Sequence, residues 1–367
     1  MSDSKFIRGK RFPLLILVAF LVGCSPEDER WQPYLFRHDG RWVAFHGIAI
    51  DGTGTKWFAT SVGIRRFNGS TWTVYDTSNS PLLNNNINTV FVDSRGDVWA
   101  ACWYHGVVRF GAGAHDQHGW SVLTKSDGLA DIYVLAITED KEGNVWFGTF
   151  DGVSKFDPTA TENAWTTLRP EYTGLTSTTV NALAVDDSGH IWFGTEPMWV
   201  SSGYVGGGLT SYNPYREGYS AWTTYDTTNS GLPSNAVRAM AFDSAGSVWI
   251  GTDRGLARFR PYTPDGQQWE TFNSTTGALP SDVVNGIAVD QSGNVWVASA
   301  DMGTAQAFKM GGVSMFDGNN WTTLTVVNSK LQDNRAIDLA VDRLGNLWIC
   351  EFVGVDVYNT SGVVREK

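Results

Sequence analysis

The phrase Asp-x-x-Gly-x-x-Trp occurs seven times in this chain, and no other feature restricts its possible folds so strongly. Its tryptophans are Trp57, Trp99, Trp146, Trp192, Trp249, Trp296 and Trp348. Six residues before each stands an aspartate, and three residues before each stands a glycine. The copies recur at a mean interval of about 48 residues, so the chain is an array of one structural unit.

Each repeat contains four short segments with strand character. In the third repeat these are residues 133–138, 145–149, 152–156 and 164–168, and no stretch shows a sustained helical period. The Asp-x-x-Gly turn joins the first two segments as a hairpin. Four strands in a unit of about 40–50 residues are typical of a β-propeller blade. The sequence therefore predicts an all-β, seven-bladed β-propeller with four-stranded blades.

The two ends of the array indicate how the ring closes. Six repeats carry a tryptophan in the fourth segment, namely Trp72, Trp120, Trp165, Trp222, Trp269 and Trp321. The seventh repeat runs out at Tyr358 without one, and residues 38–45 read like residues 316–324. We therefore expect the N-terminal strand to complete the last blade, because an open ring would leave an exposed sheet edge. The alternative is that Val363 and Val364 form this strand.

The repeat resembles the two-component regulator propeller repeat, whose core reads D-x-x-G-x-[LIV]-W-[FIV]-G-T followed by G-[LV]-x-x-[FY]. In the third repeat the two parts span residues 140–149 and 152–156. The resemblance covers nearly all of the chain beyond its leader and implies a propeller. In that family such propellers often form periplasmic sensor regions ahead of an immunoglobulin-like module, a membrane span and a histidine kinase. None of these modules follows in this sequence, so a direct signalling role is not expected.

The first 23 residues have the character of a leader. A basic start precedes an apolar run at residues 13–22 that is too short to span a membrane stably, and the run ends in Leu21-Val22-Gly23-Cys24. This resembles a bacterial lipoprotein signal, which implies cleavage before Cys24 and lipidation of its thiol. Residues 24–33 then form an acidic tether and residues 34–367 the propeller. An uncleaved anchor or a coincidental cysteine is the alternative to lipid anchoring in the cell envelope.

The chain is acidic, with a formal net charge of −11. Without residues 1–23 it holds 23 Lys+Arg against 37 Asp+Glu, a net charge of −14. Such a surface disfavours nucleic acid and anionic membranes, so membrane attachment is expected through the lipid alone. Cys102 and Cys350 lie in separate repeats and are expected as buried thiols, not as a disulfide. We expect no cofactor and a monomeric chain.

The lengths of the loops predict which face binds. In a propeller, the loops between second and third strands and the linkers between blades open on one face, and the Asp-x-x-Gly turns open on the other. The seven aspartates are therefore expected to be structural. From each anchor tryptophan to the next recurrent glycine the spacing is six or seven residues in five repeats and 16 in the fourth and sixth. Residues 196–207 and 300–311 are these insertions, with neutral variation of surface loops as the alternative.

Candidate ligand-binding residues are those that these loops bring to one face. The shorter loops contribute Trp103, Tyr104, His105, Phe150, Asp253 and Glu351, and the insertions contribute Glu196, Trp199, Tyr204, Asp301 and Phe308. Aromatic side chains beside carboxylates suit a sugar, peptide or aromatic ligand. Trp103 and Trp199 are the most informative, because they are expected to be exposed. The alternative is that these loops only pack against their neighbours.

A second set of candidates stands 11 residues before each anchor tryptophan. This ring consists of His46, Asn88, Leu135, Asn181, Arg238, Asn285 and Ile337, and the residue two positions later is apolar in every repeat. The ring is expected at the mouth of the central channel, where Arg238 could clamp a carboxylate. Solvated residues that hold ordered water are the alternative.

Binding is favoured over catalysis. The chain lacks a zinc-ligand cluster, a Gly-x-Ser-x-Gly elbow and a phosphate loop, and no catalytic or metal-binding residue is assigned. We expect an extracytoplasmic module for a small-molecule, glycan or peptide ligand, or for a partner membrane or sensor protein. The alternative is a propeller lyase or hydrolase that uses a histidine and a carboxylate at the funnel mouth.

Overall fold

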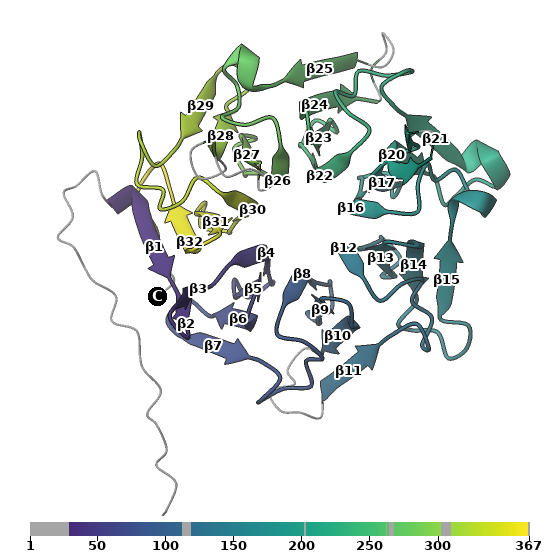
Figure 1. Cartoon of the computed structure of the whole chain (residues 1–367), viewed down its shortest axis with the longest axis horizontal. Coiled ribbons are helices and arrows are strands. Elements are labelled where there is room, and N and C mark those ends of the chain that lie inside the picture. Colours follow the sequence, from purple (N-terminus) through teal and green to yellow (C-terminus); the bar gives the residue numbers. More distant parts are fainter. Residues whose placement is uncertain are drawn as a thin grey trace, which may run out of the picture.

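The computed structural model describes residues 29–111, 119–201, 203–261, 263, 268–301 and 310–365. Seven four-stranded sheets are arranged around a central axis, as Figure 1 shows. In each sheet the first strand lies beside the axis and the fourth lies at the rim. The predicted seven-bladed, all-β propeller is confirmed.

The first four blades follow one another along the chain. Blade 1 contains β4 (Phe45–Ile50), β5 (Lys56–Thr60), β6 (Gly63–Phe67) and β7 (Trp72–Tyr75). Blade 2 contains β8 (Ile87–Val92), β9 (Val98–Cys102), β10 (Gly106–Phe110) and β11 (Trp120–Leu123). Blade 3 contains β12 (Val134–Glu139), β13 (Val145–Thr149), β14 (Gly152–Phe156) and β15 (Trp165–Leu168). Blade 4 contains β16 (Val180–Val185), β17 (Ile191–Thr195), β20 (Gly208–Tyr212) and β21 (Trp222–Tyr225).

The last three blades complete the circle. Blade 5 contains β22 (Val237–Phe242), β23 (Val248–Thr252), β24 (Gly255–Arg260) and β25 (Gln268–Phe272). Blade 6 contains β26 (Val284–Val289), β27 (Val295–Ala300), β28 (Gly311–Phe316) and β29 (Trp321–Leu324). Blade 7 contains β30 (Ala336–Val341), β31 (Leu347–Glu351), β32 (Gly354–Tyr358) and β1 (Trp31–Leu35). Short 3₁₀ helices at Pro170–Tyr172, Gly218–Ala221 and Ser274–Thr276 lie outside the sheets.

The N-terminal strand closes the ring, as predicted, but the segment that does so differs from the one aligned above. β1 pairs antiparallel with β32, and Trp31 stands opposite Tyr358. Trp31 therefore takes the position of the fourth-strand tryptophan, as Trp321 does opposite Phe316. Residues 38–45 do not supply this strand, because β2 (Arg37–His38) and β3 (Arg41–Trp42) pair with one another in a separate hairpin.

The Asp-x-x-Gly-x-x-Trp phrase is a hydrogen-bonded turn. In the third repeat Asp140 Oδ1 accepts hydrogen bonds from the backbone N–H of Glu142 (3.1 Å) and of Asn144 (2.8 Å), and Oδ2 accepts one from Trp146 Nε1 (2.7 Å). Gly143 takes φ +83°, a conformation that favours glycine. All seven anchor tryptophans donate to their aspartates in this way, at 2.7–3.1 Å. The phrase is therefore structural, as expected.

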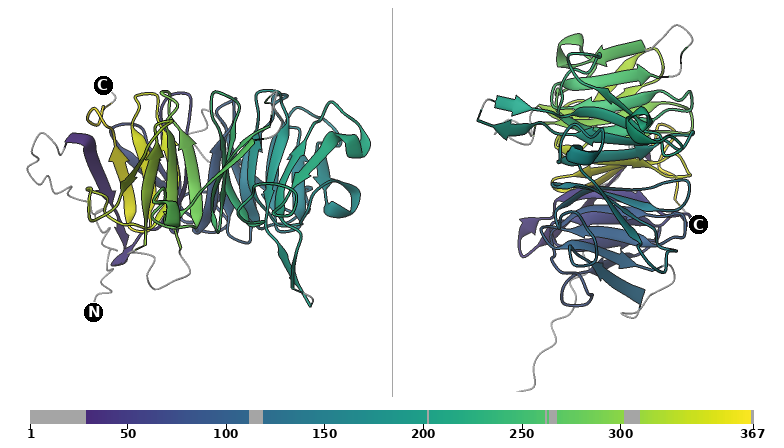
Figure 2. Two further views of the ribbon diagram at one scale, coloured as in Figure 1. Left: turned by 90° about the horizontal axis from the view of Figure 1, so that it is seen from above. Right: turned by 90° about the vertical axis from the view of Figure 1, so that its right-hand side faces the viewer.

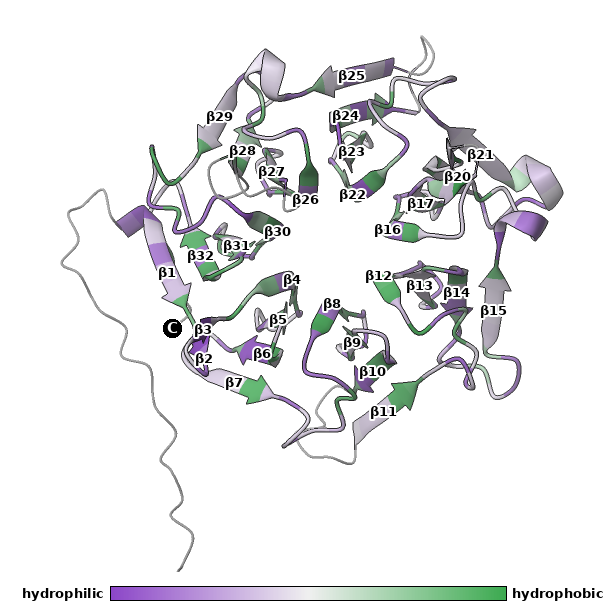
Figure 3. Ribbon diagram, in the orientation of Figure 1, coloured by the Kyte–Doolittle hydropathy of each residue, from purple (hydrophilic) through white to green (hydrophobic). Residues whose placement is uncertain are grey.

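The hydrophobic core consists of seven clusters, and each cluster lies between two neighbouring blades. Between blades 2 and 3, for example, Trp99 packs against Phe147 with ring centroids 5.6 Å apart. Figure 3 shows hydrophobic residues on the strands of every blade. Cys102 and Cys350 are both buried, unpaired thiols in this core. Because each cluster needs both of its blades, the seam between the last and first blades must close for the core to be complete.

The two faces of the ring carry different loops. The Asp-x-x-Gly turns join first and second strands on one face, and the loops between second and third strands lie on the other, which we call the funnel face. The fourth-blade insertion on the funnel face forms a hairpin of β18 (Met198–Val200) and β19 (Gly203–Val205). In both views of Figure 2 this hairpin projects well beyond the body of the ring.

Two carboxyl groups lie buried in the seventh blade. Glu351 is 0% exposed and Asp356 is 1% exposed. The Glu351 position holds threonine in four other blades, where the hydroxyl donates to the carbonyl oxygen of the third-strand glycine, as Thr149 does to Gly152 (2.8 Å). Burial raises the pKa of Asp356 to about 7, and burial together with the neighbouring Asp356 raises the pKa of Glu351 well above its ordinary value. The fold therefore favours the protonated pair.

The first prediction concerns the turn aspartate. Asp140→Ala leaves the buried Trp146 N–H and the Asn144 N–H without their acceptor, so we expect a loss of about 2–4 kcal/mol in the free energy of unfolding. Asp157→Ala is the matched control, because Asp157 accepts from Thr159 N in an exposed turn. Chemical denaturation measures both variants. Equal losses would contradict a special role for the indole hydrogen bond.

The second prediction concerns pH. The pKa of Asp356 is raised from 3.8 in the unfolded chain to about 7 in the folded protein, so the folded state binds more protons between these values. The stability that the neutral pair allows is present below pH 4 and is lost as pH rises through about 7. We expect Glu351→Gln/Asp356→Asn to gain on the order of 2–4 kcal/mol relative to wild type between pH 5 and pH 8. Melting temperatures of both proteins across this range test the difference, and parallel pH profiles would refute it.

Candidate functional site

A funnel of about 500 Å³ opens along the central axis on the funnel face. All seven residues of the predicted ring line it: His46, Asn88, Leu135, Asn181, Arg238, Asn285 and Ile337. Apolar side chains two residues further along the strands, such as Ile137, Leu183 and Met240, line it as well. Along each first strand the ring residue therefore comes first, at the mouth of the funnel, and the apolar residue follows deeper inside.

Every ring residue occupies a β-bulge. The pairing between first and second strands shifts register at this position in all seven blades: between Phe45 and Gly47, Ile87 and Thr89, Val134 and Ala136, Val180 and Ala182, Val237 and Ala239, Val284 and Gly286, and Ala336 and Asp338. A bulge inserts one unpaired residue and redirects its side chain, which is why bulges recur beside functional sites. The repeat thus presents seven side chains around one opening, and the sequence can vary them without disturbing the sheets.

Several ring side chains bridge neighbouring blades. His46 Nδ1 lies 2.7 Å from the carbonyl oxygen of Ile87, and Asn88 Nδ2 donates to that of Val134 (2.7 Å). Because a carbonyl only accepts, His46 carries its proton on Nδ1 and leaves Nε2 as a base. Burial lowers the pKa of His46, which keeps its imidazole neutral. Backbone carbonyl groups of the next blade therefore position the side chains of His46 and Asn88.

The charged groups of the funnel are Arg238, Glu196 and Asp338. Arg238 is exposed to the funnel, and Asn181 Nδ2 donates to Glu196 Oε2 at 3.0 Å. Asp338 Oδ2 accepts from the backbone N–H of Ile48 in the first blade (3.0 Å), so this carboxyl group spans the closing seam. Burial raises the pKa of Asp338 to about 6. The funnel combines one cation, two carboxyl groups and amide donors.

Aromatic side chains form one side of the funnel mouth. Tyr133 and Phe150 line the funnel, and their ring centroids lie 4.2 Å apart in a stacked arrangement. Tyr104 stacks on the opposite side of Tyr133 (4.5 Å), and Trp103 meets Tyr133 edge-on (4.9 Å). Burial raises the pKa of Tyr133 to about 12. Trp103 is half-buried in this stack, not exposed as expected, because the loop packs against its neighbour.

Tyr133 is a funnel residue that is not among the candidates expected from the sequence. It stands immediately before β12, two residues ahead of the ring residue Leu135. The other repeats carry no aromatic residue at the equivalent position, and this irregularity was the clue.

The long fourth-blade insertion divides between two places. Glu196 lines the funnel, whereas Trp199 and Tyr204 lie on the projecting hairpin and are 70% and 73% exposed. These two rings contact one another edge-on across the hairpin, with centroids 4.9 Å apart and an interplanar angle of 71°. They therefore lie on the same face as the funnel but do not contribute to its lining among the residues that the structure describes.

The remaining candidates scatter. His105 is exposed, with Nδ1 2.6 Å from the carbonyl oxygen of Trp103, and Asp253 and Asp301 are half-buried outside the described funnel lining. Glu351 is fully buried in the seventh blade, which corrects its expected place on the face, because it is the last residue of the second strand. Phe308 and Cys24 lie outside the described residues. Arg238, Glu196 and Phe150 are the candidates that meet in one cavity.

Two absences hold for the described part of the chain. No group of three His, Cys, Asp or Glu side chains there has a geometry that could hold a metal ion. No helix in the same residues is long and apolar enough to cross a membrane.

Comparison with known families gives two matches. The model of the SMP-30/gluconolactonase/LRE-like region matches residues 131–313, and the model of the two-component regulator propeller matches residues 81–104. The second match agrees with the resemblance inferred from the repeated phrase. No curated protein matches the chain.

Solved structures with this fold come from proteins of different kinds. The extracellular domain assigned to a hybrid two-component system of B. thetaiotaomicron matches with TM-score 0.72 and 20% identity over 90% of this chain and 41% of its own length. The virginiamycin B lyase of Staphylococcus aureus matches with TM-score 0.63 and 12% identity over 91% of this chain and 100% of its own. PorZ, a surface component of the type-IX secretion system of Porphyromonas gingivalis, matches with TM-score 0.65 and 17% identity over 89% and 48%.

At these identities the likeness concerns the fold. The chain spans about two fifths of the length of the two-component domains that it matches. The family match, the seven copies of the phrase and the seven sheets agree on the unit of construction. The chain is a seven-bladed β-propeller whose repeats are similar to the two-component regulator propeller repeat.

Proposed function

We propose that this protein is an extracytoplasmic binding module that holds a small anionic molecule in its funnel. The observation that carries the proposal is the set of seven bulged ring residues around one cavity, with Arg238 as its exposed cation. A guanidinium group recognises carboxylate with two parallel hydrogen bonds, and asparagine amides supply further donors. The cavity of about 500 Å³ has the size of a ligand pocket.

The lining also suggests the shape of the ligand. Tyr133 and Phe150 offer flat apolar area on one side, and Arg238 and Glu196 offer polar contacts. Carboxylated sugars and short acidic peptides combine these properties. Glu196 and Asp338 would repel a second anionic group, which favours a ligand with one negative charge.

The projecting hairpin supports a second contact on the same face, with a partner protein. It exposes Met198, Trp199, Tyr204 and Val205, and it has no charged residue between Glu196 and Arg216. Aromatic side chains and methionine are enriched at protein interfaces, and a two-stranded hairpin alone is only marginally stable. A partner that covers Trp199 would stabilise it.

The proposed location is the bacterial cell envelope, with attachment through lipid on Cys24. The support is the lipoprotein-like leader at residues 1–24 and the acidic net charge of the chain, which disfavours direct binding to anionic membranes. The names of several matched structures describe extracellular domains or a surface component.

Catalysis at the same funnel is the second candidate. The observation in its favour is His46, whose Nε2 is left unprotonated in a cavity that also contains Asp338 and Arg238. A base beside a cation could abstract a proton from a bound ligand. If the funnel catalyses a lyase reaction, the protein forms product from the ligand. His46→Ala should then abolish product formation and leave ligand binding intact.

The third prediction tests the funnel by calorimetry with charged and neutral ligand pairs, such as glucuronate against glucose and an acidic against a neutral dipeptide. We expect selective binding of the anionic members, and Arg238→Gln should weaken it about tenfold or more. Arg254→Gln is the matched control, because Arg254 is exposed on the same face but is absent from the described funnel lining. An equal loss of affinity in both variants would contradict the proposal, and so would an unchanged affinity in Arg238→Gln.

A further inference from the structure

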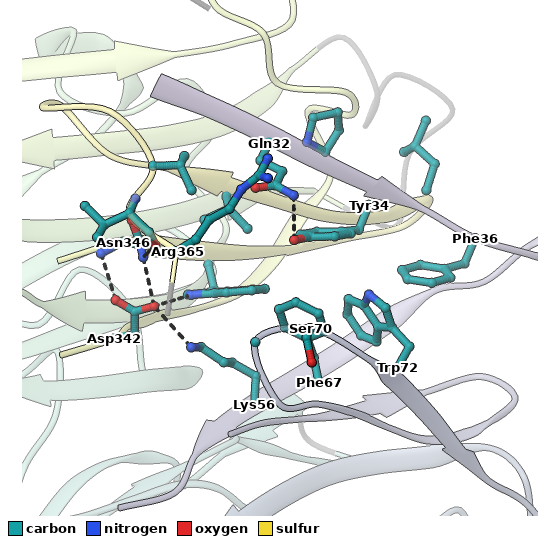
Figure 4. Close-up of a pocket in the computed structure, with 17 residues that line it drawn as sticks. Gln32, Tyr34, Phe36, Lys56, Phe67, Ser70, Trp72, Asp342, Asn346 and Arg365 are labelled. Atoms are coloured by element: carbon teal, nitrogen blue, oxygen red, sulfur yellow. Dashed lines mark hydrogen bonds and ion pairs between the residues drawn. The ribbon is translucent and has the colours of Figure 1, made fainter. Parts of the chain in front are cut away.

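A second cavity, of about 610 Å³, lies in the seam between the last and first blades. Figure 4 shows it between β1, the C-terminal residues Val363–Arg365 and the first blade. Its lining includes Asp342 and Asn346 from the β30–β31 turn and Ser70 from the β6–β7 turn. It therefore opens on the face opposite the funnel, and it shares no lining residue with the funnel.

The topology of the chain explains why this seam is hollow. In the other six blades a continuous segment connects the third strand to the fourth, whereas in blade 7 the third strand ends at Tyr358 and the fourth begins at Trp31. Two chain segments meet here instead: Asn359 N donates to Arg30 O (2.9 Å), and Val363 N donates to Glu29 O (2.8 Å). Asn346 also exchanges two hydrogen bonds with Val364. The segments are held at the edge of the cavity.

The walls of the seam cavity are aromatic. Tyr34 and Phe36 lie beside Trp72, with ring centroids 5.3 and 4.8 Å from it. Tyr34 and Trp348 are nearly parallel, with an interplanar angle of 6° and centroids 6.1 Å apart. Figure 4 shows Phe36 and Trp72 on one side of the cavity and Lys56 and Asp342 on the other. Such walls offer flat contact area to a ring.

The charged end departs from the repeat pattern. Lys56 stands where the other six repeats have Val98, Val145, Ile191, Val248, Val295 and Leu347. Its Nζ lies 3.3 Å from Asp342 Oδ2 and 5.0 Å from the ring centroid of Trp348, although the residue is only 2% exposed. In four other blades a cationic side chain from the third strand of the same blade lies over the ring of the anchor tryptophan, as Arg258 lies over Trp249. Blade 7 has Val357 at this third-strand position.

The cavity therefore contains two cations, Lys56 and Arg365, against one carboxylate, Asp342. The carboxylate already accepts hydrogen bonds from Leu344 N and from the side chain of Trp348. Arg365 is exposed and lines the cavity. The cavity is net positive, although the whole chain has a net charge of −11. A positive cavity attracts anions, so we expect it to select them.

We propose that the seam cavity is a second ligand site, which binds an amphipathic monoanion with a flat aromatic body and one carboxylate or sulfonate group. The body lies against Tyr34 and Trp72, and the anionic group lies toward Arg365 and Lys56. A ligand held here contacts both the last and the first blade, so it also strengthens the closure of the ring.

The experiment uses 8-anilinonaphthalene-1-sulfonate as the probe and N-phenyl-1-naphthylamine, which has the same body without the sulfonate, as its neutral counterpart. Calorimetry and fluorescence give stoichiometry and affinity for the whole chain. We expect one sulfonate probe per chain, with affinity lowered about tenfold in Arg365→Gln and in Lys56→Val. Arg238→Gln in the funnel and Arg254→Gln beside it should leave binding unchanged, which separates this site from the proposed function.

Each result decides the question. The neutral probe should bind more weakly and show no dependence on Arg365, and the sulfonate probe should raise the melting temperature of wild type. Equal affinity for both probes, no effect of Arg365→Gln, or loss of binding in Arg238→Gln overturns the proposal. Lys56→Val introduces the residue that four other blades carry, and its melting temperature reports folding separately. If it unfolds, the exposed Arg365 variant alone carries the test.

Discussion

The hydrogen bond from the anchor indole to the turn aspartate is the interaction on which the rest of the structure depends. The aspartate carboxylate has two roles, as Asp140 shows. Its Oδ1 accepts backbone hydrogen bonds that hold the tight turn, and its Oδ2 fixes the orientation of the large buried ring of Trp146. With its N–H satisfied, the indole can be buried without the cost of an unpaired donor. Each anchor then packs against the neighbouring blade. A local turn thereby specifies an interface between blades.

This coupling explains which parts of the fold could be predicted from sequence. The turn, the anchor and the strand order follow local rules, so the third blade matched its expected strands within a residue or two. The closing strand was misaligned because residues 38–42 imitate the Asp-Gly turn and tryptophan of a fourth strand, while Trp31 holds that position in space. Only the pairing with Tyr358 across the whole chain distinguishes the two.

The site was predictable to a different degree. The ring of seven residues follows from spacing, because every blade repeats the same bulge before the same anchor. Loop residues follow no such rule. Trp103 packs into an aromatic stack, Glu351 is the buried last residue of a strand, and Trp199 lies on the β18–β19 hairpin, which projects beyond the ring. Their places depend on neighbouring loops, which a repeat pattern does not encode.

The closing seam is where the chain departs most from its own repeat. Lys56 stands where the other six blades have an aliphatic residue, and Val357 stands where four other blades have a cation over the anchor tryptophan. Buried charge stabilises a fold less well than apolar packing does, so a scaffold alone would retain the aliphatic residue of the other blades. Instead, Lys56 of blade 1 lies over the ring of Trp348, the anchor tryptophan of blade 7. In blade 7 no continuous segment joins the third strand to the fourth. The ion pair between Lys56 and Asp342 connects blade 1 to blade 7 beside this gap, and the same charges line the cavity that we propose to bind anions.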